Sequence, residues 1–416
     1  MGCSMMCDSC DACKREETFI KFRDAHRQIT EFNYNEEIHS HPTSILLGLT
    51  NRCNLNCTYC FVHQNSLDMT LETAKKSVEF AIQNGILRDL KPFIGFFGGE
   101  PLLKFEEIIV PLVEEYADRV EFGITTNGVL LNEDIVDFFY KYNIQPLLSF
   151  DGIPVVQNSQ RPMNERGSFD IILKNIPYLL LRFPDVVMRS TVTKNSIPFI
   201  AETVNMASEL GFKKITFCPN AYEDWDKETE LKLQEQFHKV GLEVYKKLFI
   251  DSIDFPIVVD PLVNRVQLIE KATEGAVKFN NEIMRCGLGT TTCAITPNGD
   301  IVPCQEKISN PTYILGHIDN GIDSDKHKEF LNWYFNQINN IKCDKGCSEK
   351  ERLLCLSDTC PSRLEDLDFK FSTANCAFMR ASIRVASRLH YLCANSANDK
   401  VRTYFNEGSV GNDQSC

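Results

Sequence analysis

Three closely spaced cysteines in the N-terminal half of the chain are the residues best suited to chemistry. Cys53, Cys57 and Cys60 form a C-x3-C-x2-C run in a polar segment that follows an apolar one. Three thiolates at this spacing can bind three irons of a [4Fe–4S] cube and leave the fourth iron without a protein ligand. An open coordination position is where chemistry occurs in catalytic metal sites. A zinc knuckle that takes a fourth ligand from elsewhere is the alternative.

The cysteine run resembles the signature of the radical S-adenosylmethionine (SAM) superfamily. Tyr59, before the last cysteine, and Phe61, after it, also fit that signature. The resemblance implies that the open iron binds the amine and carboxylate of SAM. It also implies that one electron cleaves SAM to methionine and a 5′-deoxyadenosyl radical.

A second motif follows the next apolar segment. Gly98, Gly99, Glu100 and Pro101 resemble the GGEP motif of the same superfamily. Glycines at a strand end let the backbone approach a ligand closely, and carbonyls and a carboxylate can accept hydrogen bonds from the SAM ammonium. Alone, the two glycines would indicate a simple turn. Their position one strand after the cysteine run favours cofactor binding.

Later segments contain further residues that match SAM-binding positions of the superfamily. Thr126 and Asn127 lie in a stretch that resembles the ribose-contacting segment, although such sequences are also common in turns. Ser149 and Arg189 can together bind a carboxylate, and a structural ion pair is the equally weighted alternative for Arg189. The cofactor-binding residues implied by the resemblance are Tyr59, Gly98, Gly99, Glu100, Pro101, Thr126, Asn127, Ser149, Asp151 and Arg189.

Composition narrows the class of protein. The 416 residues include 18 cysteines, and the polar start of the chain is unlike a secretion signal, so we expect reduced thiols in a cytoplasmic metalloprotein. No segment approaches the ~18 apolar residues of a membrane span. The net charge of −13 argues against nucleic acid as the substrate, because phosphate contacts need a basic surface.

Strand-like apolar runs alternate with helical patterns through the first half of the chain. The predicted strands are 44–50, 93–97, 120–125, 145–150, 186–192 and 214–218. The predicted helices are 71–83, 105–116, 133–142, 168–181, 196–210 and 224–249, the first ending at Asn84-Gly85. This order predicts the α/β class, with a parallel sheet curled into a partial (β/α)6 barrel like part of a TIM barrel. The motifs would then converge at the C-terminal ends of the strands.

The C-terminal part of the chain is rich in cysteines and poor in long periodic segments. Metals rather than a large apolar core would therefore hold it together. Cys286, Gly299 and Cys304 have the spacing C-x12-G-x4-C, which resembles the opening of the SPASM domain of radical SAM peptide maturases. Residues 296–300 between these cysteines predict a hairpin turn. Five cysteines follow, at intervals one or two residues wider than in the family pattern: Cys343, Cys347, Cys355, Cys360 and Cys376.

Carried over by order, the resemblance implies two auxiliary [4Fe–4S] clusters with four cysteine ligands each. The first would use Cys286, Cys293, Cys304 and Cys360. The second would use Cys343, Cys347, Cys355 and Cys376. A double zinc site is the alternative for these eight residues.

Several cysteines lie outside these sets. Cys3, Cys7, Cys10 and Cys13 have metal-ligand spacing and predict a further metal site. Cys218 ends the sixth predicted strand, either as a small buried apolar residue or as a hydrogen-atom donor facing a radical. Cys393 and Cys416 have no assigned role.

The predicted organisation has five parts. They are an N-terminal cysteine-rich extension (1–43), the radical SAM partial barrel (44–220), a helical connecting region (221–285), the SPASM auxiliary-cluster domain (286–390) and a C-terminal tail (391–416).

The resemblance implies an enzyme that abstracts a hydrogen atom from a ribosomally synthesised precursor peptide and installs a cross-link. A thioether is the first expectation and a carbon–carbon bond the second. The implied partners are the precursor peptide and a reductant such as flavodoxin or ferredoxin.

Three alternatives stay open. An anaerobic sulfatase-maturating enzyme would form formylglycine, but there an Asp follows the third cysteine of the first auxiliary set, whereas Gln305 follows Cys304 here. A peptide epimerase would use Cys218. A non-enzymatic iron–sulfur or zinc protein is the third.

Overall fold

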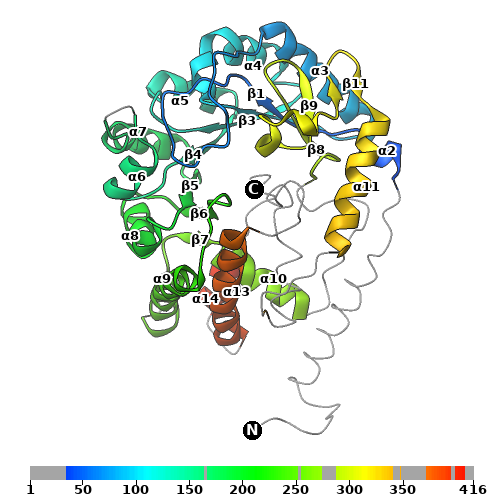
Figure 1. Ribbon diagram of the computed structural model, residues 1–416. Coiled ribbons are helices and arrows are strands. Elements are labelled where there is room, and N and C mark those ends of the chain that lie inside the picture. The colour runs from blue at the N-terminus through cyan, green and yellow to red at the C-terminus, as the bar shows by residue number, and fades with distance from the viewer. Residues whose placement is uncertain are drawn as a thin grey trace.

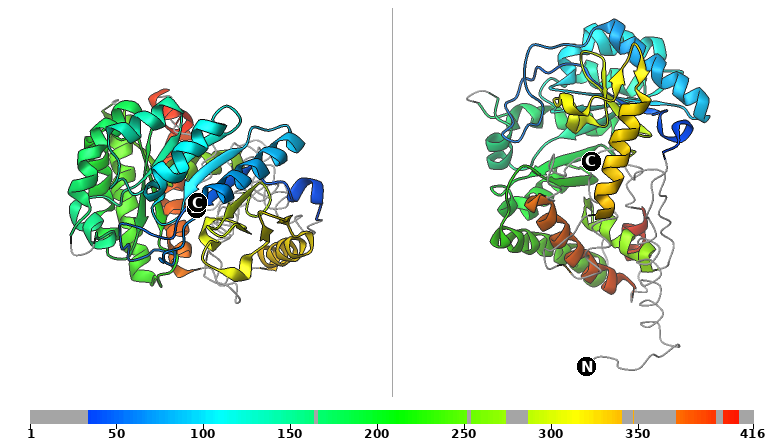
Figure 2. Two further views of the ribbon diagram at one scale, coloured as in Figure 1. Left: turned by 90° about the horizontal axis from the view of Figure 1, so that it is seen from above. Right: turned by 45° about the vertical axis from the view of Figure 1, so that its right-hand side comes forward.

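The computed structural model describes residues 34–163, 166–251, 254–273, 287–340, 347, 372–394 and 399–407. One eleven-stranded sheet runs through this part of the chain, and helices lie along its outer face (Figures 1 and 2). Neighbouring parallel strands, in order, are β1 (Ser44–Gly48), β2 (Phe93–Phe97), β3 (Glu121–Thr126), β4 (Gln145–Ser149), β5 (Val187–Val192), β6 (Lys214–Pro219) and β7 (Val258–Asp260). The predicted α/β class with a parallel, barrel-like sheet is confirmed.

Helices connect successive strands, as the alternating pattern predicts. They are α3 (Leu71–Arg88), α4 (Val110–Tyr116), α5 (Glu133–Lys141), α6 (Pro154–Gln160), α7 (Phe169–Arg182), α8 (Ile200–Glu209), α9 (Lys227–Tyr245) and α10 (Leu262–Thr273). Strand side chains such as Ile45, Ile94 and Met188 are fully buried. Each such side chain contributes ~1.5–3 kcal/mol to the free energy of unfolding relative to an exposed one.

Two predicted boundaries are wrong for local physical reasons. Helix α3 continues past Asn84-Gly85 to Arg88. It ends there because the next residue, Asp89, takes the left-handed conformation with φ 52°. Gly85 is needed where the chain folds back, since a Cβ there would lie 2.6 Å from the carbonyl oxygen of Leu90. The segment predicted as one helix over 105–116 begins instead with a π-helical turn, Phe105–Ile109.

The region predicted to be only helical contains a strand. β7 has three residues, too few to show a period-2 pattern, and it lies between α9 and α10. It extends the parallel sheet beyond β6, with Lys214 opposite Val258.

The C-terminal half adds four short strands to the other edge of the same sheet. They are β8 (Thr292–Ile295), β9 (Asp300–Val302), β10 (Gly316–His317) and β11 (Gly321–Ile322). β8 runs parallel to β1, with Thr292 opposite Ser44, and β9 to β11 follow as antiparallel neighbours. The predicted hairpin turn between β8 and β9 is confirmed. The sheet therefore crosses the predicted boundary at residue 286, and the division into domains stays a prediction.

Three further helices are described, α2 (Glu36–His39), α11 (Ser324–Asn340) and α14 (Asp399–Glu407), besides the long helix α13 (Thr373–Ala394). α13 packs against α9 and α10. At this contact the side chain of Glu230 on α9 is 1 % exposed and lies 2.6 Å from Arg380 and 2.9 Å from Arg384. Burial acts to raise the pKa of Glu230, but hydrogen bonds from Arg380 and Lys227 outweigh it, so the pKa lies below the usual value.

We predict that Glu230→Gln destabilises the fold by roughly 3 kcal/mol, because it leaves Arg380 without its buried counter-charge. The lowered pKa means that this contribution is present above pH 4.5, the ordinary glutamate value, and is lost as pH falls through the folded-state pKa. Urea unfolding should therefore show a gap between wild type and variant at pH 7 that closes on acidification. Glu228→Gln, which removes the exposed pair with Lys232, is the control and should leave the midpoint unchanged.

Candidate active site

The C-terminal ends of the parallel strands surround one cavity. The space not filled by protein atoms in and around it, with the open mouth included, is about 1290 Å³. Its walls include the predicted residues Cys53, Cys57, Tyr59, Cys60, Gly98, Gly99, Glu100, Thr126, Asn127, Ser149, Arg189 and Cys218. The predicted convergence of the motifs on one rim is confirmed.

Cys53, Cys57 and Cys60 lie in the loop that follows β1, which we call the cysteine loop, and all three line this cavity. No group of three or more His, Cys, Asp or Glu side chains in the described residues is gathered closely enough to hold a single metal ion. Each thiolate ligand of a cube binds a different iron, so such ligands need not meet at one point. Burial raises the pKa of the Cys53 and Cys57 thiols to about 12 and about 11. Iron binding must therefore displace protons from these sulfurs.

The two glycines of the GGEP motif pack against the base of the cysteine loop. The amide of Gly99 donates to the Thr50 carbonyl at 2.7 Å, and that of Glu100 donates to the Arg52 carbonyl at 2.9 Å. A Cβ at Gly99 would lie 2.1 Å from the Arg52 oxygen, and Gly98 has a φ of 132°. The contact thus requires glycine at both positions. Pro101 is buried at the start of the 3₁₀ helix η1 (Pro101–Lys104) and does not line the cavity.

Glu100 is a fully buried carboxylate on the cavity wall. Its Oε1 accepts from the Leu102 amide at 3.1 Å and from Thr126 Oγ1 at 2.8 Å. Its Oε2 accepts from the Asn127 amide at 2.9 Å. A carboxylate can accept about four hydrogen bonds, so one position remains for a ligand. Burial raises the pKa of Glu100 to about 7, and the three hydrogen bonds only partly offset that effect.

Thr126 and Asn127, predicted to contact a ribose, support neighbouring groups of the site. Thr126 donates to Glu100, as described above. Asn127 Nδ2 donates to Asn54 Oδ1 at 2.7 Å and to Cys53 Sγ at 3.7 Å. Asn127 therefore ties the third strand end to the cysteine loop while also lining the cavity.

Ser149 and Arg189 stand opposite each other in the β4–β5 register, and both line the cavity. Their adjacency meets the geometric condition for holding one carboxylate between them. Within the described residues, Arg189 forms no ion pair within 4.0 Å. This favours ligand binding over the structural ion pair.

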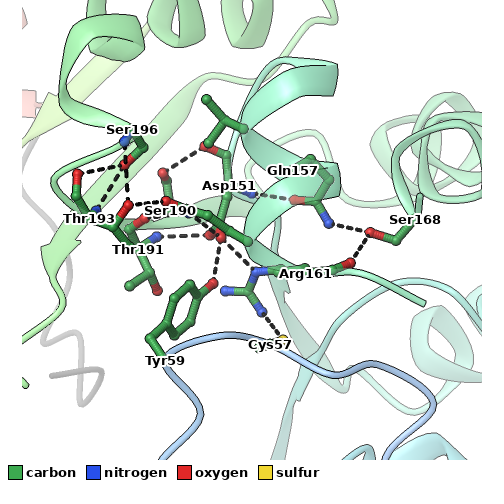
Figure 3. A network of polar contacts seen from close by, with 12 residues as sticks. Cys57, Tyr59, Asp151, Gln157, Arg161, Ser168, Ser190, Thr191, Thr193 and Ser196 are labelled. Atoms are coloured by element: carbon green, nitrogen blue, oxygen red, sulfur yellow. Dashed lines mark hydrogen bonds and ion pairs between the residues drawn. The ribbon is translucent and has the colours of Figure 1, made fainter. Parts of the chain in front are cut away.

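Asp151 does not line the cavity but lies behind its wall, in the network of polar contacts shown in Figure 3. Its carboxylate accepts from the Thr191 amide at 2.9 Å, from Gln160 Nε2 at 2.7 Å and from the Tyr59 hydroxyl. It also forms an ion pair with Arg161 Nε at 3.1 Å. With a fully buried side chain and its oxygens engaged by protein groups, Asp151 positions Tyr59 and Arg161 and does not face a ligand directly.

Sequence reasoning missed Arg161. This residue follows α6, lines the cavity and points one guanidinium nitrogen at Cys57 Sγ, 4.0 Å away. Burial acts to lower the pKa of Arg161, but Asp151, Tyr59 and Cys57 outweigh it, so the pKa is raised and the side chain stays charged. The sequence around it contains no pattern that separates this buried arginine from those on the surface.

The remaining cysteines fall into three groups. Cys218 lines the cavity from β6, and Cys304 caps the 3₁₀ helix whose residues Gln305 and Glu306 also line it. Cys293 lies in the hydrophobic core, so a packing role competes with its predicted role as an iron ligand. The other predicted cysteine sites, Cys3, Cys7, Cys10, Cys13, Cys286, Cys343, Cys355 and Cys360, lie outside the described residues.

Two predicted ligands of the second auxiliary cluster lie near one arginine. Arg380 Nη1 donates to Cys347 Sγ at 3.8 Å. Cys376 lies four residues before Arg380 on α13, hence one turn away on the same helix face. This placement agrees with the assignment of Cys347 and Cys376 to one set, which stays a prediction.

Comparison with known families decides the class of this domain. Residues 47–196 match the family model described as the radical SAM superfamily. The chain carries a radical SAM domain. The matched segment runs from β1 to the turn after β5 and so contains the cysteine loop, Glu100 and the Ser149–Arg189 pair.

Relatives of the radical SAM domain include enzymes with named activities. The chain is 28 % identical over 245 residues to the radical SAM cyclopropyl synthase TigE of Paramaledivibacter caminithermalis, covering 52 % of this chain and 50 % of TigE. It is 26 % identical over 332 residues to a cysteine-type anaerobic sulfatase-maturating enzyme of Clostridium novyi, covering 72 % and 83 %. A Methanocaldococcus jannaschii protein, MJ0907, is 31 % identical over 178 residues, covering 42 % and 61 %. The chain thus spans only half to three fifths of TigE and MJ0907.

Solved structures share the fold. The structure of anSMEcpe with bound AdoMet superposes with a TM-score of 0.68 at 19 % identity, covering 88 % of this chain and 98 % of the other. SuiB of Streptococcus suis, bound to its precursor peptide SuiA, gives 0.56 at 16 % identity, covering 87 % and 79 %. The radical SAM fold is confirmed by these likenesses. Among the described helices, none is long and apolar enough to span a membrane.

We predict that Glu100 makes the stability of the SAM-free protein depend on pH. Because its folded-state pKa is raised from 4.5 to about 7, stability falls as pH rises through that interval, by about 3 kcal/mol in total. Glu100→Gln should remove this slope in urea unfolding measured from pH 5 to 8. It should also weaken SAM binding by ~10–100-fold in equilibrium dialysis, since a charge-assisted hydrogen bond is lost.

The exposed Glu106→Gln variant is the matched control and should behave as wild type in both measurements. A wild-type slope in Glu100→Gln would contradict the assigned ionisation of Glu100.

Proposed function

We propose that this chain is a radical SAM peptide maturase that installs a cross-link in a ribosomally synthesised peptide. The observation that supports this most is the shared cavity. It joins three thiols, a buried carboxylate with one free acceptor position and the Ser149–Arg189 pair. These are the groups needed to hold a cluster with an open iron and the amino-acid end of SAM.

In this proposal, each group of the chain has a defined task. Cys53, Cys57 and Cys60 hold the cluster, and Glu100 accepts from the SAM ammonium. Ser149 and Arg189 bind the SAM carboxylate by hydrogen bonds from a hydroxyl and a guanidinium. When bound, cluster and SAM supply a 5′-deoxyadenosyl radical able to abstract a hydrogen atom. Leu55, Phe61, Val62 and Phe97 give this side of the cavity an apolar lining that limits water.

The peptide substrate would enter past other residues of the cavity lining. These are the segment Cys218 to Tyr222, together with Gln305 and Glu306. Two structures with this fold support a peptide partner, since anSMEcpe was solved with the Cp18Cys peptide and SuiB with its precursor peptide SuiA. We propose a thioether as the bond formed and a carbon–carbon bond as the next choice. The likeness to a cyclopropyl synthase supports the carbon–carbon bond.

The proposed cofactors and partners extend beyond the described site. Two auxiliary [4Fe–4S] clusters in a SPASM domain would accept the electron released when the product bond closes. A flavodoxin or ferredoxin would reduce the first cluster. Eighteen cysteines, most of them proposed as iron ligands, suit the reducing cytoplasm, where we place the reaction.

Formylglycine formation is the second candidate function. The likeness to the sulfatase-maturating enzyme extends over 83 % of that protein, more than for TigE. Gln305 stands where that family has its catalytic Asp, but the adjacent Glu306 also lines the cavity and would supply a carboxylate. The substrate test below separates the two functions.

We predict that the Cys53/Cys57/Cys60 triple alanine variant loses ~4 of the ~12 irons expected for three cubes in reconstituted protein. It should also lose all SAM cleavage, whereas Cys347→Ala and Cys376→Ala should keep uncoupled cleavage and lose peptide product. Iron analysis and chromatography of 5′-deoxyadenosine measure these effects. Stoichiometric zinc with little iron in the wild type would refute the proposal, and full product from the auxiliary variants would refute their redox role.

We predict that Cys218→Ala leaves cross-linking largely intact, because oxidative coupling removes hydrogen and needs no donor. In deuterated water the peptide product should be ~2 Da lighter per bond, with no carbon-bound deuterium. Mass spectrometry makes the measurement, on a short cysteine-containing peptide sought in the reading frames beside the gene of this chain. A product of unchanged mass apart from one deuterium at Cα, lost in Cys218→Ala, would instead establish an epimerase. Conversion of Ser or Cys to an aldehyde would establish formylglycine formation.

A further inference from the structure

The buried side chain of Arg161 contacts Cys57 in the cysteine loop, and the proposed function assigns no task to this contact. It is 8 % exposed, and its guanidinium lies between the Asp151 carboxylate and Cys57 Sγ (Figure 3). The guanidinium carbon lies 5.3 Å from the centroid of the Tyr59 ring. The side chain is therefore enclosed by an anion, an aromatic face and a sulfur.

Asp151 fixes the direction in which Arg161 points. The carboxylate is anchored by the Thr191 amide, Gln160 Nε2 and the Tyr59 hydroxyl, so it cannot turn away. Gln160 is held in turn, because its Oε1 accepts from Thr193 Oγ1 at 2.6 Å. With Nε on Asp151 at 3.1 Å, the free end of the planar guanidinium is directed at Cys57.

A fixed N–H donor beside a cluster sulfur affects the cluster's reduction potential. Hydrogen bonds to sulfur and nearby positive charge stabilise the reduced state, which carries one more negative charge. In a buried site this effect is only weakly screened. Asp151, which is paired with Nε on the other side of the guanidinium, opposes it from a greater distance.

We propose that Arg161 is a positioning residue that holds the Cys57 sulfur and raises the reduction potential of the cluster on Cys53, Cys57 and Cys60. Asp151 orients Arg161 and counteracts part of its charge. This inference rests on the proposed function, since it requires that cluster. Arg161, oriented by Asp151, thus helps to set how readily this cluster accepts an electron.

The test is a redox titration followed by electron paramagnetic resonance, on the full chain reconstituted anaerobically without SAM. The signal of the Cys53/Cys57/Cys60 triple variant is subtracted to leave only the cluster in question. Arg161→Gln should lower the ratio of reduced to oxidised cluster at least tenfold at a given potential, which is 59 mV for one electron. Arg161→Lys, which keeps the charge, should recover part of the loss.

Two further variants make the result specific. Asp151→Asn should shift the potential in the opposite direction, because the charge of Arg161 is then unopposed. Arg52→Gln is the matched control, since Arg52 adjoins Cys53 but is half-exposed and paired with Asp68. It removes the same charge without touching a sulfur and should leave the potential unchanged.

Each outcome decides the matter. Wild-type potential in Arg161→Gln, or an equal shift in Arg52→Gln, overturns the inference. A folded Arg161→Gln variant that specifically lacks ~4 irons, which Arg161→Lys regains, supports it. Should Arg161→Gln fail to fold, an unchanged potential in Asp151→Asn overturns the inference and a raised one supports it. Absence of the cluster from the wild type would refute the proposed function instead.

Discussion

The close packing of the Gly98–Gly99 backbone on the base of the cysteine loop is the constraint on which the site depends. Two amides of the motif donate to the Thr50 and Arg52 carbonyls, at separations that leave no room for a side chain. This contact fixes the end of β2 relative to the loop after β1. It therefore fixes the distance between the Glu100 carboxylate, which follows β2, and the three thiols, which follow β1.

Charge is distributed around the cavity so that buried ions support one another. Burial raises the pKa of Glu100 to about 7, because its three hydrogen-bond donors only partly offset the desolvation and no arginine or lysine in the described residues lies within 4.0 Å. Arg161 on the cavity wall is paired with Asp151 behind it, while Arg189 lines the cavity beside Ser149. In the proposed function, this distribution of charge would suit a ligand with both a cationic and an anionic end.

The sequence was sufficient to predict the strand order from β1 to β6 and most of the cavity wall. Both depend on patterns within short segments: alternation of apolar runs, cysteine spacing and glycines at strand ends. It was insufficient for Arg161, whose importance comes from contacts with Asp151 and with Cys57, the second of which is 104 residues away in sequence. It also did not reveal that Asp151 lies behind the cavity wall, since a motif position does not show which way a side chain faces.

Long-range pairing was the other feature that local patterns could not reveal. β8 shows no sign in its own four residues that it pairs with β1, because a period-2 pattern specifies a face and not a partner. The placement of Cys293 in the core follows from that pairing, since it stands opposite Ile45. A cysteine can thus belong to a metal-ligand pattern and still occupy a core position.

The pairing of β8 with β1 also imposes an order on biosynthesis. β1 emerges first from the ribosome, but its second neighbour follows only after the whole barrel has been made, at ~5–20 residues per second. During that interval β1 has an unpaired edge, which is a hazard for aggregation. The same interval leaves one side of the adjoining cysteine loop uncovered, because the wall that contains Gln305 and Glu306 does not yet exist. Iron delivered before the β8–β9 hairpin docks would meet the thiols from an open side, whereas later delivery must pass through the mouth of the finished cavity.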